Sequence, residues 1–167
     1  MLSALLRSRL KKIKLLATDV DGVLTDGGMY YSENGNELKR FNVRDGMGMV
    51  ILRNAGIRVA IITSEDTEVV RRRAEKLKVT DLFLGAKDKV AAMEKLLKRH
   101  ALSWNDVAYI GDDLNDHELL KRVGFAATPA DGTEQNKAIA HYITKKKGGE
   151  GCVREICDLL LELHPSR

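Results

Sequence analysis

The sequence predicts an α/β fold, a parallel sheet covered by helices on both faces. Short apolar runs of strand type alternate with segments of helical periodicity along the 167 residues, and this alternation is typical of βαβ units. Polar residues follow three of these runs, at the edge where an open parallel sheet binds its ligands. The length suits one domain, and we expect a single domain over residues 1–167.

The first part of the chain predicts a lead-in, a strand and a hairpin. Residues 1–14 form a short amphipathic segment whose apolar stretch is too short for a signal peptide or a membrane span. An apolar run predicts the first strand near residues 13–19. A hairpin flap is expected near residues 26–42, because Asn34-Gly35 is a strong turn signal between two strand-like runs. It follows the first acidic motif directly, so we expect it to stand over the mouth of the site.

After the hairpin, strand and helix patterns alternate. The further strands are expected near residues 57–62, 81–84, 106–110, 123–127 and 141–143. The helices are expected near residues 46–55, 67–78, 88–99, 114–121, 133–139 and 150–163. Neither the gap after the first strand nor the gap after the second is long enough for a separate cap domain. Gly46 and Gly48 lack a third glycine in register, which excludes a dinucleotide-binding loop.

Composition excludes several classes of function. The net charge is only +4, and the basic residues are scattered apart from Lys145-Lys146-Lys147, which we interpret as a solvated loop; no nucleic-acid partner is expected. Cys152 and Cys157 form neither a CxxC motif nor a metal-ligand pattern. We therefore expect a cytoplasmic protein with free thiols and no membrane partner.

Acidic residues at the ends of apolar runs predict a metal-dependent phosphate site. Asp19 and Asp21 follow the first expected strand, and Asp112 follows the run that ends at Gly111. Two carboxylates about 4 Å apart repel each other by roughly 4 kcal/mol at an effective dielectric constant near 20. Oxygen ligands without His or Cys nearby in sequence favour a hard cation, and Mg²⁺ is the usual one beside phosphate. The expected cofactor is Mg²⁺.

Four segments resemble, in order and spacing, the motifs of the haloacid dehalogenase-like (HAD) phosphatases. They are Asp19-Val20-Asp21-Gly22-Val23, Thr63, Lys89 and Gly111-Asp112-Asp113-Leu114-Asn115-Asp116. The resemblance implies a Rossmann-like fold and hydrolysis of a phosphate monoester through an aspartyl-phosphate. It also favours Lys89 over Lys87, between which the sequence alone does not decide.

The catalytic roles implied by the resemblance agree with the chemistry of the residues. Asp19 is the expected nucleophile, and Asp21 the expected proton donor and acceptor. Thr63 is expected to hold phosphate oxygens, although a lone Thr before a helix is more often an ordinary N-cap. Lys89 is expected to neutralise the nucleophile and the phosphate.

The acidic residues divide into metal ligands and supporting groups. Asp19, the backbone carbonyl of Asp21 and Asp112 are the expected ligands. Asp113 and Asp116 are expected to orient metal-bound waters and Lys89. For Asp116, an acidic turn that caps the next helix is an equally good interpretation.

Further motifs are similar to those of a small capless branch of the family. It contains the phosphatases of eight-carbon 3-deoxy-D-manno-octulosonate 8-phosphate (KDO 8-phosphate) and of nine-carbon 2-keto-3-deoxynononate 9-phosphate. The motifs are Leu24-Thr25-Asp26-Gly27-Gly28, Phe41-Asn42-Val43-Arg44-Asp45-Gly46 and Gly148-Gly149-Glu150-Gly151, and the resemblance runs from about Lys12 to Leu163. It implies a homotetramer whose hairpins pack centrally and whose subunits close one another's sites. The last motif is glycine-rich and is expected to be a flexible tail that reaches a neighbouring subunit.

The substrate implied by the resemblance is a sugar-acid phosphate, whose carboxylate calls for a second cationic patch. The candidates are Arg44, Arg73 and Lys76, with Glu65 as a hydrogen-bond acceptor for sugar hydroxyls. The octulosonate enzymes usually continue the second motif as T-G-R, whereas this chain has Thr63-Ser64-Glu65. The combination of Glu65, Arg73 and Lys76 is similar to the pattern of the nine-carbon enzymes. The segment Phe41–Gly46 is similar to the eight-carbon enzymes, so the sequence leaves the chain length of the substrate open.

Other classes of function explain less of the sequence. A calcium loop that starts at Asp19 fails, because Leu24 and Tyr30 stand where Gly and Glu are needed. A phosphotransfer receiver lacks the second aspartate two residues after the first. A non-catalytic oligomerisation domain, like the phosphatase-like tail of some sugar-nucleotide synthetases, would not need the acidic residues and Lys89 to be intact.

Overall fold

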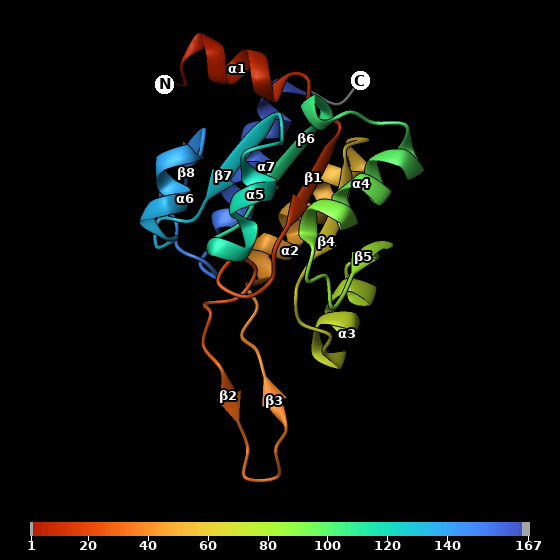
Figure 1. Ribbon diagram of the computed structural model, residues 1–167, viewed down its shortest axis with the longest axis vertical. Coiled ribbons are helices and arrows are strands. Elements are labelled where there is room, and N and C mark those ends of the chain that lie inside the picture. Colours follow the sequence, from red (N-terminus) through yellow and green to blue (C-terminus); the bar gives the residue numbers. More distant parts are fainter. Residues whose placement is uncertain (1, 165–167) are drawn as a thin grey trace.

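The computed structural model describes residues 2–164, and its centre is a sheet of six parallel strands (Figure 1). Across the sheet the order is β5-β4-β1-β6-β7-β8. The strands are β1 (Leu15–Thr18), β4 (Arg58–Ile62), β5 (Asp81–Phe83), β6 (Val107–Ile110), β7 (Phe125–Thr128) and β8 (Tyr142–Ile143). The first strand of the chain therefore lies in the middle of the sheet, between β4 and β6.

Helices cover both faces of the sheet, as the sequence predicts. One face packs against α2 (Val43–Asn54), α3 (Glu68–Lys76) and α7 (Cys152–Leu163), and the other against α4 (Lys89–His100), α5 (His117–Leu120) and α6 (Glu134–Ile139). Successive side chains of β1 point to opposite faces, so Leu16 lies in the first of these cores, and Leu15 and Ala17 lie in the second. Burial on both faces explains why the strand runs are apolar throughout.

The expected N-terminal lead-in is a helix, α1 (Ala4–Leu10), at the end of the molecule opposite the hairpin (Figure 1). Leu10 is fully buried in the first core. The described residues also form two 3₁₀ turns, η1 (Trp104–Asp106) and η2 (Leu114–Asp116). No helix of the described residues is long and apolar enough to cross a membrane.

The largest differences from the sequence-based expectation concern three parts of the chain. The helix α2 begins at Val43 and not near residue 46, because the Asn42 side chain accepts a hydrogen bond from the Arg44 N–H and caps the helix earlier. The expected helix near 114–121 is divided into η2 and α5, since Asp116 turns inward to the site. The strands of the hairpin are only two residues each, β2 (Tyr30–Tyr31) and β3 (Glu37–Leu38).

The expectation of a flexible tail at Gly148–Gly151 is wrong. Gly148 and Gly149 are buried, and the Gly149 N–H donates to the Val23 carbonyl at 2.9 Å. A Cβ on Gly148 would lie 1.9 Å from the Gly22 carbonyl oxygen, so only glycine allows this approach. The segment supports the first acidic loop from within the same subunit, and α7 follows it into the core.

The hairpin projects from the body at the end where the parallel strands finish (Figure 1). Its strands pair through Tyr30 with Leu38 and Tyr31 with Glu37. A bridge between Thr25 and Phe41 joins its base. The hairpin thus rises beside the edge of the sheet on which the predicted site residues lie.

Candidate active site

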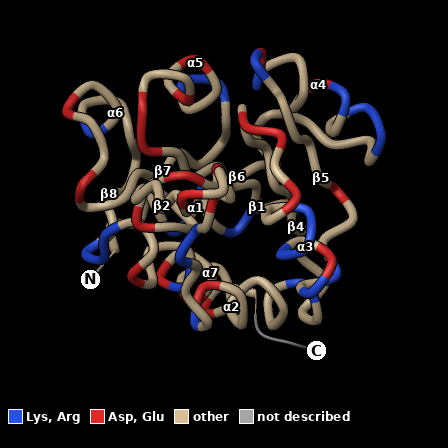
Figure 2. The backbone as a smooth tube through the Cα atoms, turned by 90° about the horizontal axis from the view of Figure 1, so that it is seen from below, with Lys and Arg blue, Asp and Glu red and all other residues tan. Residues whose placement is uncertain are grey.

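The carboxyl ends of the central strands bring the predicted residues to one cavity. Asp19 directly follows β1, Thr63 directly follows β4, and Asp112 lies one residue beyond Gly111 after β6. Seen from the hairpin end, acidic segments lie near the middle of the molecule, whereas the basic segments of α4 lie at the rim (Figure 2). The cavity has a volume of about 440 Å³ and is lined by Asp19, Asp21, Gly22, Gly27, Thr63, Ser64, Glu65, Asp112, Asp113, Leu114 and Asn115.

A buried lysine joins two of the aspartates, in an arrangement that we call the inner bridge. Lys89 Nζ lies 2.6 Å from Asp19 Oδ2 and 2.7 Å from Asp116 Oδ1, and all three side chains are at most 5% exposed. Lys89 reaches this place because Asp88 caps the first turn of α4 and Lys89 is its first residue. The hydroxyl of Tyr109, a residue of β6, also donates to Asp116 Oδ1, at 2.5 Å.

The electrostatics of the inner bridge favour additional positive charge. Burial and the neighbouring charge of Asp116 raise the pKa of Asp19 well above its ordinary value, although Lys89 opposes this. Burial lowers the pKa of Lys89, but the two carboxylates outweigh it and keep the lysine charged. One ammonium group between two buried carboxylates leaves an excess negative charge, which a cation in the cavity would balance.

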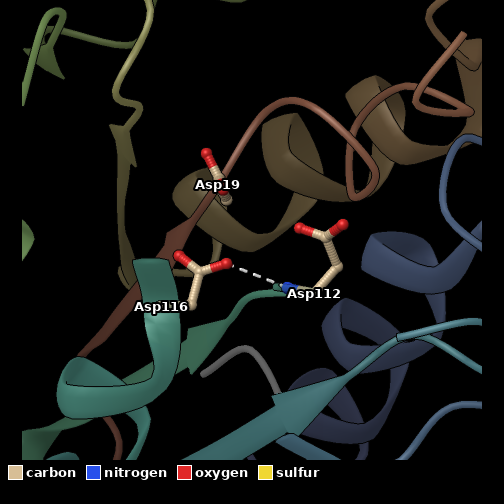
Figure 3. Close-up of side chains that lie close together, drawn as sticks. All are labelled: Asp19, Asp112 and Asp116. Carbon is tan, nitrogen blue, oxygen red and sulfur yellow. Dashed lines mark hydrogen bonds between the residues drawn. The ribbon is translucent and has the colours of Figure 1, made fainter. Parts of the chain in front are cut away.

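Asp112 supplies a third carboxylate to this region. One carboxylate oxygen each of Asp19, Asp112 and Asp116 lies within 4.8 Å of the other two, and the three side chains lie close together (Figure 3). Burial, followed by the charges of Asp116 and Asp113, raises the pKa of Asp112 to about 7. Gly22 permits the approach, because its φ is +76° and a Cβ there would lie 2.0 Å from Asp112 Oδ2.

The hydrogen bonds of Asp116 distinguish it from a metal ligand. Its Oδ1 accepts from Lys89 and Tyr109, and its Oδ2 accepts from the backbone N–H groups of Asp112 and Asp113. Both oxygens are thus used to fix the lysine and the loop. Asp19 accepts only one hydrogen bond at each oxygen, from the Val20 N–H and from Lys89, so each oxygen keeps a lone pair for a cation. Among the described residues, no protein group donates to the carboxylate of Asp112, so Asp112 and Asp19 can face a cation, together with the carbonyl of Asp21. This set of hard oxygen donors fits Mg²⁺.

A second lysine, Lys39, contacts Asp21, and the sequence did not point to it. Lys39 Nζ lies 2.6 Å from Asp21 Oδ1 and 2.8 Å from Glu37 Oε1, and its side chain is fully buried. We call this arrangement the outer bridge. Its signal in the sequence is faint: Glu37 and Lys39 are two apart on an extended arm and so share a side.

The phosphate-binding candidate Thr63 is buried at the bottom of the cavity. Its hydroxyl accepts from the Glu65 N–H at 3.3 Å. The helix α3 begins only at Glu68. Thr63 is therefore not the N-cap of that helix, although that is the ordinary interpretation of such a residue. Ser64 lies beside it and accepts a hydrogen bond from Asn115 across the cavity, at 3.3 Å.

Asp113 does not contact Lys89; its side chain accepts from the Leu114 N–H at 2.7 Å and caps η2. Its carbonyl accepts a 2.7 Å hydrogen bond from Asn136, a buried residue that the sequence did not identify. The N–H of Thr133 donates to the Asp112 carbonyl at 2.9 Å. The beginning of α6 thus holds the loop that carries Asp112.

Of the four candidate substrate-binding residues, only Glu65 lines the cavity. Arg73 donates to the Asn42 carbonyl at 3.1 Å and lies over the Phe41 ring, where it supports the base of the hairpin. Arg44 lines another cavity beside α7, and Lys76 is exposed on α3. Among the described residues of one subunit, the cavity wall therefore presents carboxylates and no cationic side chain for a substrate carboxylate.

The comparisons with known proteins agree with this geometry. Residues 63–156 match the haloacid dehalogenase-like hydrolase family. The 3-deoxy-D-manno-octulosonate 8-phosphate phosphatase of Escherichia coli strain B is 43% identical over 159 residues, which cover 95% of this chain and 85% of that protein.

Two solved structures have the same fold. The 3-deoxy-D-manno-octulosonate 8-phosphate phosphatase of Yersinia pestis has a TM-score of 0.96 and 42% identity, with 99% of this chain and 89% of that chain covered. The 3-deoxy-D-manno-octulosonate 8-phosphate phosphatase of Moraxella catarrhalis, solved with magnesium, phosphate and KDO, has a TM-score of 0.93 and 42% identity. The match covers 95% of this chain and 91% of that chain. The chain therefore belongs to the haloacid dehalogenase-like hydrolases, in the family of the 3-deoxy-D-manno-octulosonate 8-phosphate phosphatases.

Proposed function

We propose that the chain is a Mg²⁺-dependent phosphatase that hydrolyses KDO 8-phosphate to KDO and inorganic phosphate. The observation that carries the proposal is the position of Asp19. It directly follows the central strand β1, its Oδ2 lies 2.6 Å from Lys89 Nζ, and it lines the same cavity as Asp21, Thr63 and Asp112. The relatives named for this activity are similar over almost the whole chain.

In the first half of the reaction, a carboxylate oxygen of Asp19 attacks phosphorus. The bond from phosphorus to the sugar oxygen breaks, and Asp21 in its protonated form gives its proton to that oxygen. The products are free KDO and an aspartyl-phosphate on Asp19. Lys89 stays charged and holds Asp19, while Thr63 and neighbouring N–H groups hold the phosphate oxygens.

In the second half, water attacks the phosphorus of the aspartyl-phosphate, and the Asp21 carboxylate takes a proton from that water. The bond to Asp19 breaks, which restores the carboxylate and releases inorganic phosphate. Mg²⁺, held by Asp19, Asp112 and the carbonyl of Asp21, would balance the negative charges of the phosphate and the carboxylates. Asp116 and Asp113 keep the loop and Lys89 in place.

The relatives favour the eight-carbon substrate over the nine-carbon one, and Glu65 offers a way to test the choice. Glu65 is exposed at the mouth of the cavity, where its carboxylate can accept hydrogen bonds from sugar hydroxyls. We expect Glu65→Arg to change kcat/KM for KDO 8-phosphate and for the nine-carbon 9-phosphate by different factors, by about tenfold or less. Equal changes would mean that Glu65 supports the fold or the phosphate site.

A homotetramer with sites completed by neighbouring subunits is part of the proposal. Four apolar or aromatic side chains of the hairpin, Met29, Tyr30, Tyr31 and Leu38, are 46 to 65% exposed. Contact with other subunits would remove this apolar surface from water. The absence of cations from the described cavity wall also supports a contribution from a neighbour, for which the exposed Arg44 and Lys76 are candidates. Sedimentation equilibrium tests the assembly, and a monomeric, fully active enzyme would contradict it.

We place the enzyme in the cytoplasm. Cys152 and Cys157 are free and buried in α7, and burial raises the pKa of both thiols above their ordinary value. Such thiols are typical of a reducing compartment. Localisation of a tagged full-length chain in its host checks the placement.

The central experiment measures phosphate release from KDO 8-phosphate and from the nine-carbon 9-phosphate in parallel. With Mg²⁺, kcat/KM should be at least about tenfold higher for KDO 8-phosphate, and EDTA should abolish turnover of both. The oligomerisation-domain alternative predicts no release from either substrate. Preference for the nine-carbon substrate would correct the substrate and leave the phosphatase chemistry in place.

A further inference from the structure

The outer bridge is unusual for its place on the hairpin. The side chains around it are exposed, yet Lys39 has no solvent-accessible side-chain surface. Its ammonium group contacts one carboxylate of the hairpin, Glu37, and one of the catalytic loop, Asp21. Met29, on the other arm of the hairpin, lies against Lys39, with its sulfur 3.9 Å from Nζ. Lys39 thus contacts both arms of the hairpin and the catalytic loop.

The hydrogen bond from Lys39 gives the two carboxylate oxygens of Asp21 different surroundings. Oδ1 accepts from Lys39, whereas Oδ2 has no hydrogen-bond donor among the described residues. Asp21 also lines the cavity. With Oδ1 fixed, the side chain cannot rotate freely, and Oδ2 remains the oxygen that can exchange a proton with the leaving sugar or with water.

The surroundings of Lys39 favour its charged form. Burial opposes its charge, but the hydrogen bonds to Asp21 and Glu37 raise the pKa of Lys39 above its ordinary value. An ammonium group that donates to Asp21 and forms an ion pair with Glu37 restricts the Asp21 side chain.

We propose that Lys39 is a positioning residue that orients Asp21 for proton transfer and makes the hairpin a part of the catalytic machinery. The inference rests on the proposed function, because it acts through the acid and base role of Asp21. It gives the hairpin a task within its own subunit, in addition to any contact with other subunits.

The test compares variants on a series of aryl phosphates whose phenols differ in pKa. A well-placed proton donor makes kcat/KM depend weakly on the leaving group. Lys39→Met should make this dependence steeper, with a loss of about tenfold or more for the poorest leaving groups and less than about threefold for p-nitrophenyl phosphate. Lys39→Arg, which keeps the charge, should recover most of the loss.

A matched control is the neighbouring ion pair of the hairpin. Arg40 lies 2.8 Å from Asp26 and is exposed, so Arg40→Met removes a pair of similar length that does not touch Asp21. We expect no change in the leaving-group dependence of this variant. The same slope in Lys39→Met and wild type, or equal losses on all aryl phosphates, would overturn the proposal.

Asp21→Asn separates this proposal from the proposed function. It removes the proton donor, so its leaving-group dependence should be the steepest of the series. If Asp21→Asn shows the wild-type dependence, the acid role of Asp21 fails. If Asp21→Asn steepens the dependence and Lys39→Met does not, only the role of Lys39 fails.

Discussion

The inner and outer bridges have the same composition, a lysine between two carboxylates, but they differ in how far they are exposed to solvent. In each, one lysine lies between two carboxylates, one of which belongs to the first acidic motif: Asp19 for Lys89 and Asp21 for Lys39. The inner bridge is enclosed by the sheet and α4, and its two carboxylates are at most 5% exposed. The carboxylates of the outer bridge are 22 to 29% exposed, on a hairpin with two-residue strands.

This difference shows how the site divides its work. A nucleophile must be held still at the end of a strand, and the inner bridge does this in the rigid centre of the molecule. A residue that passes protons to a departing sugar and from water must face the solvent side of the cavity. The outer bridge restrains such a residue from the hairpin, where the paired carboxylates are partly exposed to solvent.

The largest expected effect concerns the carboxylate of the inner bridge. Asp19→Asn should lower turnover to below about a hundredth of wild type, because an amide does not attack phosphorus and the metal loses an anionic ligand. The measurement is kcat with saturating Mg²⁺, together with circular dichroism to show that the fold is kept. Turnover above that limit in a folded variant would contradict the role of Asp19.

Replacement of the lysine should lower the free energy of unfolding more for the inner bridge than for the outer bridge. Lys89→Met leaves two buried carboxylates without their partner and should lower the free energy of unfolding by about 3–5 kcal/mol. Lys39→Met should cost about 1 kcal/mol, because its carboxylates can be hydrated. Urea unfolding without metal compares them, and failure of Lys89→Met alone to fold would be the extreme form of this result. Equal losses would mean that burial does not distinguish the bridges.

The hydroxyl of Tyr109 provides a smaller test of the inner bridge. Tyr109→Phe removes one hydrogen bond to the charged Asp116 and should lower the free energy of unfolding by about 1.5–3 kcal/mol. Tyr142→Phe is the control, since its hydroxyl donates to Glu155 at 2.7 Å in a half-buried place far from the inner bridge. A larger loss in Tyr142→Phe would contradict the importance we give to the Tyr109 contact.

The smallest effect is a dependence of Mg²⁺ binding on pH. The pKa of Asp112 is raised to about 7 in the metal-free protein, first by burial, so a proton competes with the cation below that pH. Mg²⁺ affinity should fall by up to about tenfold per pH unit below pH 7 and change little above it. Calorimetric titration with Mg²⁺ checks this, and Asp113→Asn, which removes a neighbouring charge, should move the fall to lower pH. Constant affinity from pH 5.5 to 8 would contradict the role of Asp112.

The sequence predicts most of the fold, because apolar runs buried on both faces and periodic helices leave a clear pattern. The HAD assignment and the parallel sheet are confirmed. The structure also brings Asp19, Thr63, Lys89 and Asp112 to one place, since each stands beside the end of a strand or the start of a helix. Their catalytic roles remain predictions for the variants above.

The residues that the sequence did not reveal depend on contacts between distant segments. Lys39 belongs to an exposed arm, and nothing in its neighbours shows that it folds back on Asp21. Tyr109 stands within an apolar strand run, where an aromatic residue indicates core packing and does not disclose a hydroxyl on Asp116. The glycines at Gly148–Gly149 indicated flexibility by composition, whereas they serve close backbone packing.

The most direct test of the account is to find the phosphoryl group during turnover. Enzyme mixed with KDO 8-phosphate and Mg²⁺ is quenched in acid within one turnover, digested and examined by mass spectrometry. We predict a phosphoryl group on Asp19 and none in Asp19→Asn. In Asp21→Asn, which lacks the base that activates water, we predict a larger phosphorylated fraction when p-nitrophenyl phosphate, whose leaving group needs no proton donor, replaces KDO 8-phosphate. Phosphate release without any phosphorylated Asp19, or with the group on another residue, would contradict the division of work between the two bridges.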